Sequence, residues 1–204
     1  VLPEDAQALD AAGKNVVVLG GGDTAMDCVR TAIRQGAKSV RCLYRRDRAN
    51  MPGSTREVKN AEEEGVQFEW LAAPEAFLGD THVTGVRASR MKLRLPDASG
   101  RQSVEPLEGY SFTLDADLVI AALGFDPEPL PQLWDEPALA ASRWGTLKVD
   151  QKSFMTSLPG VFAAGDIVRG ASLVVWAIKD GREAAQSIHE WIRADATART
   201  AEQG

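Results

Sequence analysis

The chain has 204 residues, of which 44% are hydrophobic and 25% charged, and its formal net charge at pH 7 is −6. These values exclude a disordered chain, and the negative charge argues against general binding to nucleic acid. No apolar run approaches the ~20 residues of a membrane-spanning helix, and the N-terminus has no signal-peptide pattern, so we expect a cytoplasmic protein that does not associate with membranes.

The first predicted unit is a strand, a glycine-rich turn, a helix and a second strand. Residues 14–19 form an apolar, β-branched run typical of a buried parallel strand. Apolar residues at helical spacing follow between residues 25 and 33, and Gly36 ends that helix. Residues 39–44 form a second β-prone run, which completes a β–turn–α–β unit.

The middle of the chain predicts further α/β structure and a set of hairpins. A capping-box pattern at Ser54 opens a short helix that ends at Gly65, and alternating apolar residues predict a strand over 66–70. Short β-prone pieces between residues 81 and 114 predict antiparallel hairpins. Residues 117–122 then predict another buried strand.

The last third of the chain predicts a second domain. Four prolines between residues 127 and 137 mark a domain crossing. Beyond them we expect strands at 147–149 and 161–164, the latter buried, and a helix over about 172–192. The predicted division is residues 14–126, residues 127–194 and a tail over 195–204.

The glycines after the first strand fit the pattern G-x-G-x-x-G/A of dinucleotide-binding turns. Gly20 makes the tight turn, Gly22 lets the backbone approach a pyrophosphate, and Ala25 keeps the helix close to the strand. The helix N-terminus offers free N–H groups and a positive dipole end to the phosphates. We therefore expect dinucleotide binding, the alternatives being a structural turn or another nucleotide-like ligand. The predicted cradle is Gly20, Gly21, Gly22, Asp23, Thr24 and Ala25.

The residues after the second strand indicate which dinucleotide binds. An NAD site usually has Asp or Glu there for the ribose hydroxyl, whereas this chain has Arg45 and Arg46. A guanidinium fork suits a 2′-phosphate, so the sequence favours NADP over NAD. The alternative is a solvated basic loop, and Arg48 either adds to the clamp or faces water.

A second cofactor signal lies near the C-terminus. The predicted strand at 161–164 leads into Gly165 and Asp166, and a carboxylate there could accept hydrogen bonds from the ribityl chain of a flavin. A helix with Leu173 and Val174 in its first turn follows, and its dipole could face the flavin ring. The alternative is an ordinary strand–loop–helix.

Several segments together resemble the small (β) subunit of bacterial NADPH-dependent glutamate synthases, which belongs to a broader group of flavin oxidoreductases. The resemblance covers about residues 14–192 in order. The segments that carry it are residues 19–28, 44–46, 51–53, 61–66, 122–125 and 161–177.

The resemblance implies an α/β protein with a Rossmann-like FAD/NAD(P)-binding fold, an antiparallel β-meander and a partial second α/β domain. Residues 14–126 would be the NADPH-binding domain and 127–194 the C-terminal segment of a FAD-binding domain. The implied activity is hydride transfer from NADPH to FAD. Electrons would then pass through iron–sulfur clusters to the large subunit, which makes glutamate from glutamine and 2-oxoglutarate.

The resemblance also assigns site residues and partners. Gly20 to Ala25 would hold the pyrophosphate and Arg45 with Arg46 the 2′-phosphate. Ala122 and Gly124 would line the nicotinamide side. The residues implied to contact the flavin are Gly165, Asp166, Leu173 and Val174. The implied partners are the glutamate synthase large subunit and the N-terminal part of the same subunit, and the chain alone could form a homo-oligomer.

Parts of the family pattern are absent from this sequence. The chain lacks the first glycine turn, for the FAD adenosine half, and the cysteine-rich cluster segment, so we expect an incomplete FAD site, iron–sulfur clusters only outside this chain, and little activity of the chain alone. Its two cysteines, Cys28 and Cys42, are expected in the core, with no metal site. No catalytic side chain is expected, because the cofactors carry the hydride chemistry.

Other classes of protein remain as alternatives with different expectations. One is a related flavin oxidoreductase feeding another partner, and another is a redox sensor that binds NADP without turnover. A disulfide reductase would need a CxxC pair, which is absent. A methyltransferase would need an acidic residue after the second strand, where Tyr44, Arg45 and Arg46 stand.

Overall fold

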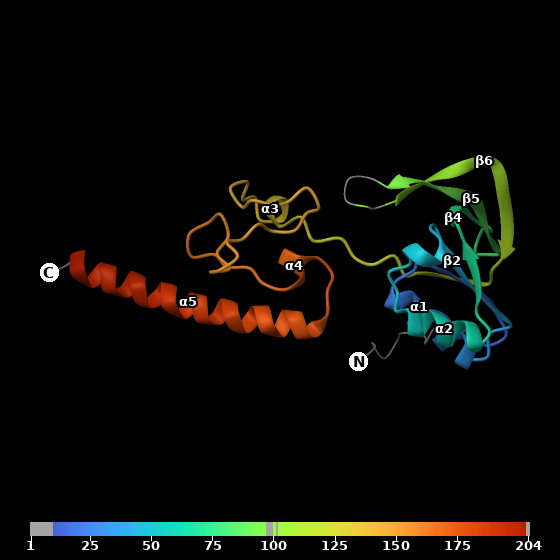
Figure 1. Cartoon of the computed structure of the whole chain (residues 1–204), viewed down its shortest axis with the longest axis horizontal. Coiled ribbons are helices and arrows are strands. Elements are labelled where there is room, and N and C mark those ends of the chain that lie inside the picture. Colours follow the sequence, from blue (N-terminus) through green and yellow to red (C-terminus); the bar gives the residue numbers. More distant parts are fainter. Residues whose placement is uncertain (1–9, 97–99, 101, 203–204) are drawn as a thin grey trace. The chain divides into compact units, whose positions relative to one another are not determined.

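The structure, a computed structural model, describes residues 10–96, 100 and 102–202, with the side chains of the last helix described as far as Ala194. The chain divides into two compact units, Val1–Gly124 and Phe125–Gly204 (Figure 1). The division falls at the start of the proline-rich stretch in which the sequence predicts a domain crossing.

A four-stranded parallel sheet forms the centre of the first unit. Its strand order is β3-β2-β1-β7, and its strands are β1 (Asn15–Leu19), β2 (Ser39–Tyr44), β3 (Gln67–Trp70) and β7 (Leu118–Ala121). These strands were predicted, but β7 is only partly buried because it is an edge strand. Helix α1 (Asp23–Arg34) lies between β1 and β2 in the chain, and helix α2 (Thr55–Glu63) lies between β2 and β3.

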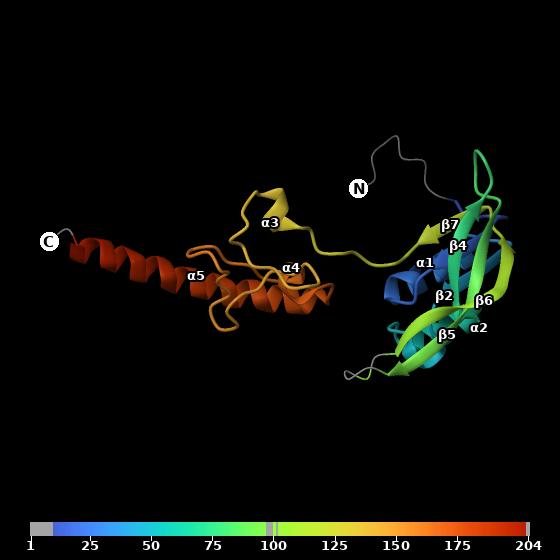
Figure 2. The ribbon, with the colours of Figure 1, turned by 90° about the horizontal axis from the view of Figure 1, so that it is seen from above.

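The helices and the β-meander cover opposite faces of this sheet (Figure 1). The predicted antiparallel meander has three strands, β4 (Ala72–Leu78), β5 (Gly85–Pro96) and β6 (Gln102–Asp115), in the order β4-β5-β6. Figure 2 shows β5 and β6 as two long strands running side by side. The sequence did not predict β4, because Pro74 and a register shift between Pro74 and Ala76 interrupt its alternation.

Alternate residues of β1 supply two separate cores. Val16 and Val18 pack with the apolar face of α1, including Met26 and Val29. Val17 packs in a second cluster, with residues of the meander that include Val86. Such alternation is expected for a strand covered on both faces.

Both cysteines belong to the helix-side core, as predicted. Cys42 is buried in it and Cys28 packs against it, and both are free thiols. Burial raises the pKa of the Cys42 thiol to about 12, so this group stays protonated at neutral pH.

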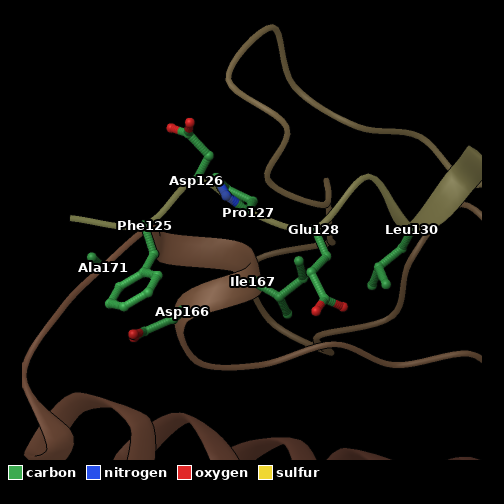
Figure 3. Close-up of a pocket in the computed structure, with 8 residues that line it drawn as sticks. All are labelled: Phe125, Asp126, Pro127, Glu128, Leu130, Asp166, Ile167 and Ala171. Carbon is green, nitrogen blue, oxygen red and sulfur yellow. The ribbon is translucent and has the colours of Figure 1, made fainter. Parts of the chain in front are cut away.

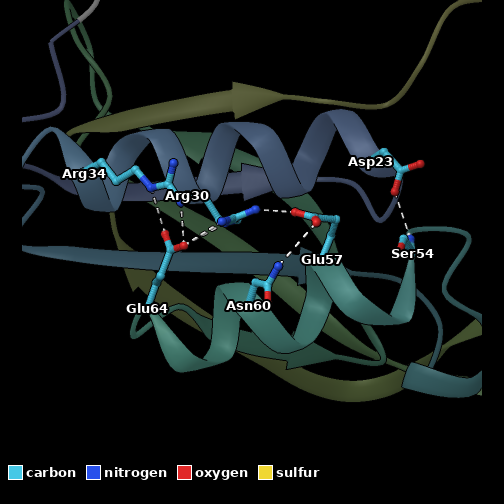
Figure 4. Close-up of polar contacts among 7 residues, drawn as sticks. All are labelled: Asp23, Arg30, Arg34, Ser54, Glu57, Asn60 and Glu64. Atoms are coloured by element: carbon cyan, nitrogen blue, oxygen red, sulfur yellow. Dashed lines mark hydrogen bonds and ion pairs between the residues drawn. The ribbon is translucent and has the colours of Figure 1, made fainter.

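Ion pairs join α1 to α2 across the surface of the first unit (Figure 4). Arg30 donates to Glu57 and to Glu64, the latter at 2.8 Å, and Arg34 donates to Glu64 at 2.7 Å. Hydrogen bonds lower the pKa of the Glu64 carboxyl from its ordinary 4.5 to about 2, and the bond from Arg34 contributes more to this shift than the bond from Arg30. The carboxylate form of Glu64 is therefore favoured by folding.

This pKa shift predicts an acid-dependent loss of stability. Because the pKa of Glu64 is depressed in the folded state, its contribution is present above pH 4.5 and is lost as the pH falls toward 2. We expect Glu64→Gln to lower the thermal midpoint at pH 7, and the difference from wild type to disappear near pH 2. Thermal unfolding followed by circular dichroism measures this. Glu63→Gln is the matched control, because Glu63 is exposed and forms a long ion pair, at 3.6 Å, with the equally exposed Lys59. An equal effect of both changes would contradict the prediction.

The second unit is built from helices and irregular chain. It contains α3 (Leu130–Leu133), α4 (Asp166–Arg169) and α5 (Val174–Glu202). The strands predicted at 147–149 and 161–164 are wrong: Leu147 and Phe162 each form one isolated bridge, and Val161 is exposed. A run of apolar residues becomes a strand only where a neighbouring strand pairs along its length, and within the described residues no such strand adjoins these segments.

Helix α5 differs from its predicted bounds at the C-terminal end. It continues to Glu202, ten residues past the expected end at Ile192, because the residues beyond Ile192 include several alanines, which favour helix. No helix in the described part of the chain is both long and apolar enough to cross a membrane.

A few contacts attach α5 to the rest of its unit. The buried Asp180 pairs with Arg169 of α4, and the Trp191 ring meets Phe162 edge-on with 6.2 Å between centroids. Leu173, directly before α5, and residues of the first turns, including Val174 and Ile178, are exposed. The helix therefore presents apolar side chains that its own unit leaves uncovered.

Candidate functional site

A cavity of about 660 Å³ opens in the first unit at the carboxyl ends of β1, β2 and β7. In open α/β sheets this is the edge at which ligands bind. The residues that line it come from the glycine turn, the end of β2, the start of β4 and the segment after β7: Leu19, Gly20, Gly21, Gly22, Thr24, Leu43, Tyr44, Arg45, Arg46, Asn50, Pro52, Ala72, Ala73, Pro74, Ala122, Leu123 and Gly124.

Each of the three positions in the turn requires glycine for a different reason, or does not require it at all. Gly20 has φ +143°, and a Cβ there would lie 2.2 Å from the carbonyl oxygen of Ala122. A Cβ on Gly21 would lie 2.4 Å from the ring of Tyr44. Gly22 has nothing within 4 Å of the position of a Cβ. The fold therefore requires the first two glycines, whereas Gly22 leaves open space at the cavity.

Helix α1 begins at the cavity without a side-chain cap. Gly22 is the N-cap, and its carbonyl accepts from the amides of Ala25 and Met26 at 3.0 and 3.2 Å. The amides before Ala25 have no acceptor within the helix, as at any helix N-terminus. Two predicted cradle residues do not line the cavity: Asp23 accepts from the Ser54 amide at 2.9 Å (Figure 4), and Ala25 is fully buried.

The arginines after β2 divide between the cavity and the surface. Arg45 and Arg46 line the cavity, and Arg46 Nε is fully buried with no hydrogen-bond partner among the described residues. Arg48 instead donates to both carboxylate oxygens of Glu62, at 2.7 and 2.9 Å. In this structure its charge is paired with Glu62 at the surface, which favours the surface alternative for Arg48 over a place in the clamp.

Sequence reasoning missed Asn50 and the start of β4 as parts of this cavity. Asn50 lies in a short 3₁₀ turn, Arg48–Asn50, whose N-cap is Asp47. The only available signal was the position of Asn50 five residues after the predicted arginine pair began. The residues from Ala72 to Pro74 gave no signal, because the meander brings them to the cavity from outside the β–turn–α–β unit.

The flavin residues implied by the resemblance lie in the second unit and are only partly brought together. A cavity of about 390 Å³ there is lined by Asp166 and by the segment that follows residue 124 (Figure 3). Gly165, with φ +76°, is the N-cap of α4 directly before Asp166. Leu173 and Val174 are exposed and do not line this cavity.

Comparison with known proteins identifies the family. Residues 2–181 match the family model described as pyridine nucleotide-disulphide oxidoreductase. The chain is 69% identical over 191 residues to the glutamate synthase (NADPH) small chain of Azospirillum brasilense, which covers 94% of this chain and 40% of that protein. It is 50% identical over 184 residues to the protein of the same name from Escherichia coli K12, which covers 88% of this chain and 39% of that protein. The chain thus spans less than half the length of these relatives.

A solved structure supports the fold. Thioredoxin reductase from Lactococcus lactis matches with a TM-score of 0.71 and 21% identity, over 90% of this chain and 54% of that one. The predicted Rossmann-like fold with an antiparallel meander is confirmed. The chain belongs to the pyridine nucleotide-disulphide oxidoreductase family and is homologous to the small chain of NADPH-dependent glutamate synthase.

Proposed function

We propose that the first unit binds NADP(H) in the cavity at the glycine turn. The pyrophosphate would lie over Gly22 and the first turn of α1, and the 2′-phosphate against Arg45 and Arg46. Asp23 and Ala25 would serve this site by shaping the turn rather than by contact. Ala122 and Gly124 would line the nicotinamide side.

The observation that carries this proposal is the buried Nε of Arg46, which has no hydrogen-bond partner in the described part of the chain. Leaving a buried donor without a partner costs on the order of 1–3 kcal/mol. A phosphate dianion that accepts a hydrogen bond from this Nε would remove that cost, and charge-assisted bonds from a guanidinium fork to phosphate are among the strong ones. The open space at Gly22 independently fits a pyrophosphate.

Titration calorimetry of the chain with NADPH and with NADH tests the proposal. We expect one NADPH per chain, bound at least about tenfold more tightly than NADH, because a charge-assisted contact contributes about 1.5–3 kcal/mol. Equal affinities would overturn the assignment of the arginines, and no saturable binding of either would overturn the site.

We further propose that the second unit contributes the flavin end of a FAD site. Asp166 presents a carboxylate to a cavity, Gly165 gives the backbone its turn, and the exposed first turn of α5 offers amides beside Leu173 and Val174. These residues fit a flavin ring and ribityl chain. The sequence holds one G-x-G-x-x-G/A turn, at residues 20–25, and the first unit uses it. FAD, when bound, would supply the acceptor for the hydride of NADPH.

The 204-residue chain on its own is expected to bind NADP but not to retain FAD at one per chain. The adenosine and pyrophosphate half of FAD would have no glycine turn in this chain. The absorption spectrum of the purified chain measures this, and a yellow protein with one flavin per chain would contradict it.

The exposed apolar residues at the start of α5 also predict self-association. Exposed patches of this kind favour contacts with other surfaces, so we expect a dimer or larger assembly. Light scattering after size exclusion measures this, and a strict monomer at high concentration would contradict it.

The wider role that we propose is electron input for glutamate synthesis in the cytoplasm. In it, this chain's residues bind NADPH and present it to FAD, and iron–sulfur clusters held outside this chain carry electrons to the large subunit. That subunit would make glutamate from glutamine and 2-oxoglutarate. The 69% identity to a glutamate synthase small chain supports this role.

Two alternatives are a flavin oxidoreductase that feeds another acceptor and a sensor that binds NADP without turnover. Stopped-flow reduction of flavin by NADPH, in a preparation that joins this chain to a complete FAD site, separates the sensor from the two enzymes. Adding the large subunit and measuring glutamate then separates the enzymes.

A further inference from the structure

Asn50 connects three parts of the first unit beside the candidate NADP site. Its amide N–H and its Nδ2 both donate to Asp47 Oδ1, at 3.0 and 2.8 Å. Its Nδ2 also donates to Oε1 of Gln102, at 3.1 Å, and its carbonyl accepts from the Tyr44 hydroxyl at 2.9 Å. Asn50 itself lines the cavity.

The hydrogen-bond partners fix the orientation of this amide. A carboxylate such as Asp47 only accepts, so the Asn50 atom facing it must be the NH₂ group. The Gln102 atom facing Asn50 must then be its oxygen. Consistently, Gln102 Nε2 donates at 3.3 Å to the carbonyl of Arg94 in the neighbouring strand β5.

Further bonds attach Arg46 and its neighbour Asp47 to the β5–β6 hairpin. On one side, the carbonyl of Arg46 accepts from the Leu71 amide at 3.0 Å, and Leu71 in turn accepts from Met91 of β5 at 2.7 Å. On the other side, Asp47 is tied through Asn50 to Gln102 of β6. Arg46 and Asp47 are thus each attached to the β5–β6 hairpin. Arg46 also lines the cavity, and its Nε is buried.

We propose that Asn50 is a positioning residue for coenzyme specificity: with Asp47 and Gln102, it holds Arg46 in the arrangement that receives the 2′-phosphate. This inference rests on the proposed NADP(H) site. A long arginine side chain loses conformational entropy when it is ordered on binding, and a segment ordered in advance reduces that cost. Asn50 therefore acts on ligands that carry the 2′-phosphate and has little effect on those that lack it.

The test compares Asn50→Ala with wild type, using NADPH, NADH and 2′,5′-ADP as ligands in calorimetry. We expect the dissociation constants of NADPH and 2′,5′-ADP to rise about five- to tenfold, which is the size of effect that loss of one hydrogen bond produces. The dissociation constant of NADH should change less than about twofold. Gln102→Ala removes only the attachment to the hairpin. It should also raise the dissociation constants of NADPH and 2′,5′-ADP, but by a smaller factor. Asn60→Ala is the matched control, because Asn60 donates to Glu57 on α2 and does not line the cavity.

A double-mutant cycle shows whether Asn50 acts through Arg46. In an Arg46→Ala background, Asn50→Ala should cause no further loss of NADPH affinity, since coupled residues are non-additive. An equal loss for NADPH and NADH in Asn50→Ala, or full additivity with Arg46→Ala, would overturn the positioning role. If wild type itself did not prefer NADPH, the proposed function would fail. If Arg46→Ala lost that preference while Asn50→Ala kept it, only this inference would fail.

Discussion

Replacing Gly22 with valine should abolish dinucleotide binding and leave the first unit folded. Gly22 has φ −87° and ψ 177°, an extended conformation that valine adopts readily. Nothing lies within 4 Å of its Cβ position, so the side chain would enter the cavity where the pyrophosphate is expected. Valine is a poor N-cap, which costs the helix about 1 kcal/mol. Calorimetry should detect no NADPH binding, while circular dichroism shows a native spectrum.

Two other glycines serve as controls for this prediction. Gly181 lies on α5 and, like Gly22, has nothing within 4 Å of its Cβ position. Gly181→Val should therefore leave NADPH binding unchanged. Gly20→Ala should destabilise the whole unit, because its Cβ would lie 2.2 Å from the Ala122 carbonyl at φ +143°. Undiminished NADPH binding by folded Gly22→Val would show that the coenzyme lies elsewhere.

Replacing Arg45 and Arg46 together with alanine should remove the preference for NADPH. Each charge-assisted hydrogen bond to a phosphate contributes about 1.5–3 kcal/mol, or roughly ten- to a hundredfold in affinity. We expect the NADPH dissociation constant to rise at least tens-fold and that of NADH to change little. Arg46→Ala alone should account for the larger share, because the Nε of Arg46 is already desolvated whereas Arg45 is exposed.

Arg48→Ala is the matched control for the arginine pair. Arg48 lies two residues further along but donates to Glu62, so its loss should leave both dissociation constants unchanged. Equal losses for NADPH and NADH in the Arg45/Arg46 double variant would mean that these arginines support the fold rather than bind the phosphate.

The β–turn–α–β unit was predictable because its signals are local. A β-branched run, adjacent glycines and an amphipathic helix follow one another within about thirty residues. Each of these patterns reflects a local requirement, either a backbone conformation or one buried face, and so can be read from neighbouring residues. The same signals placed Gly22, Arg45 and Arg46 at the cavity. The separate roles of Gly20 and Gly21 depend on Ala122 and Tyr44, which approach from other strands.

Features that depend on distant partners could not be predicted. Asn50 reaches Gln102 across a separation of 52 residues, and no local pattern reports such a bond. The residues at 161–164 have the composition of a buried strand, but composition does not say whether a neighbouring strand is present to pair with them. Asp23 fits the motif in sequence, yet its carboxylate accepts a hydrogen bond from the Ser54 amide, 31 residues away.

A crystal structure of the chain with bound NADP⁺ tests the central claim most directly. The account predicts the pyrophosphate over Gly22 and the amides of the first turn of α1, with the 2′-phosphate accepting a hydrogen bond from Arg46 Nε. Coenzyme density outside this cavity, or a bound coenzyme whose 2′-phosphate faces solvent away from Arg46, would contradict it.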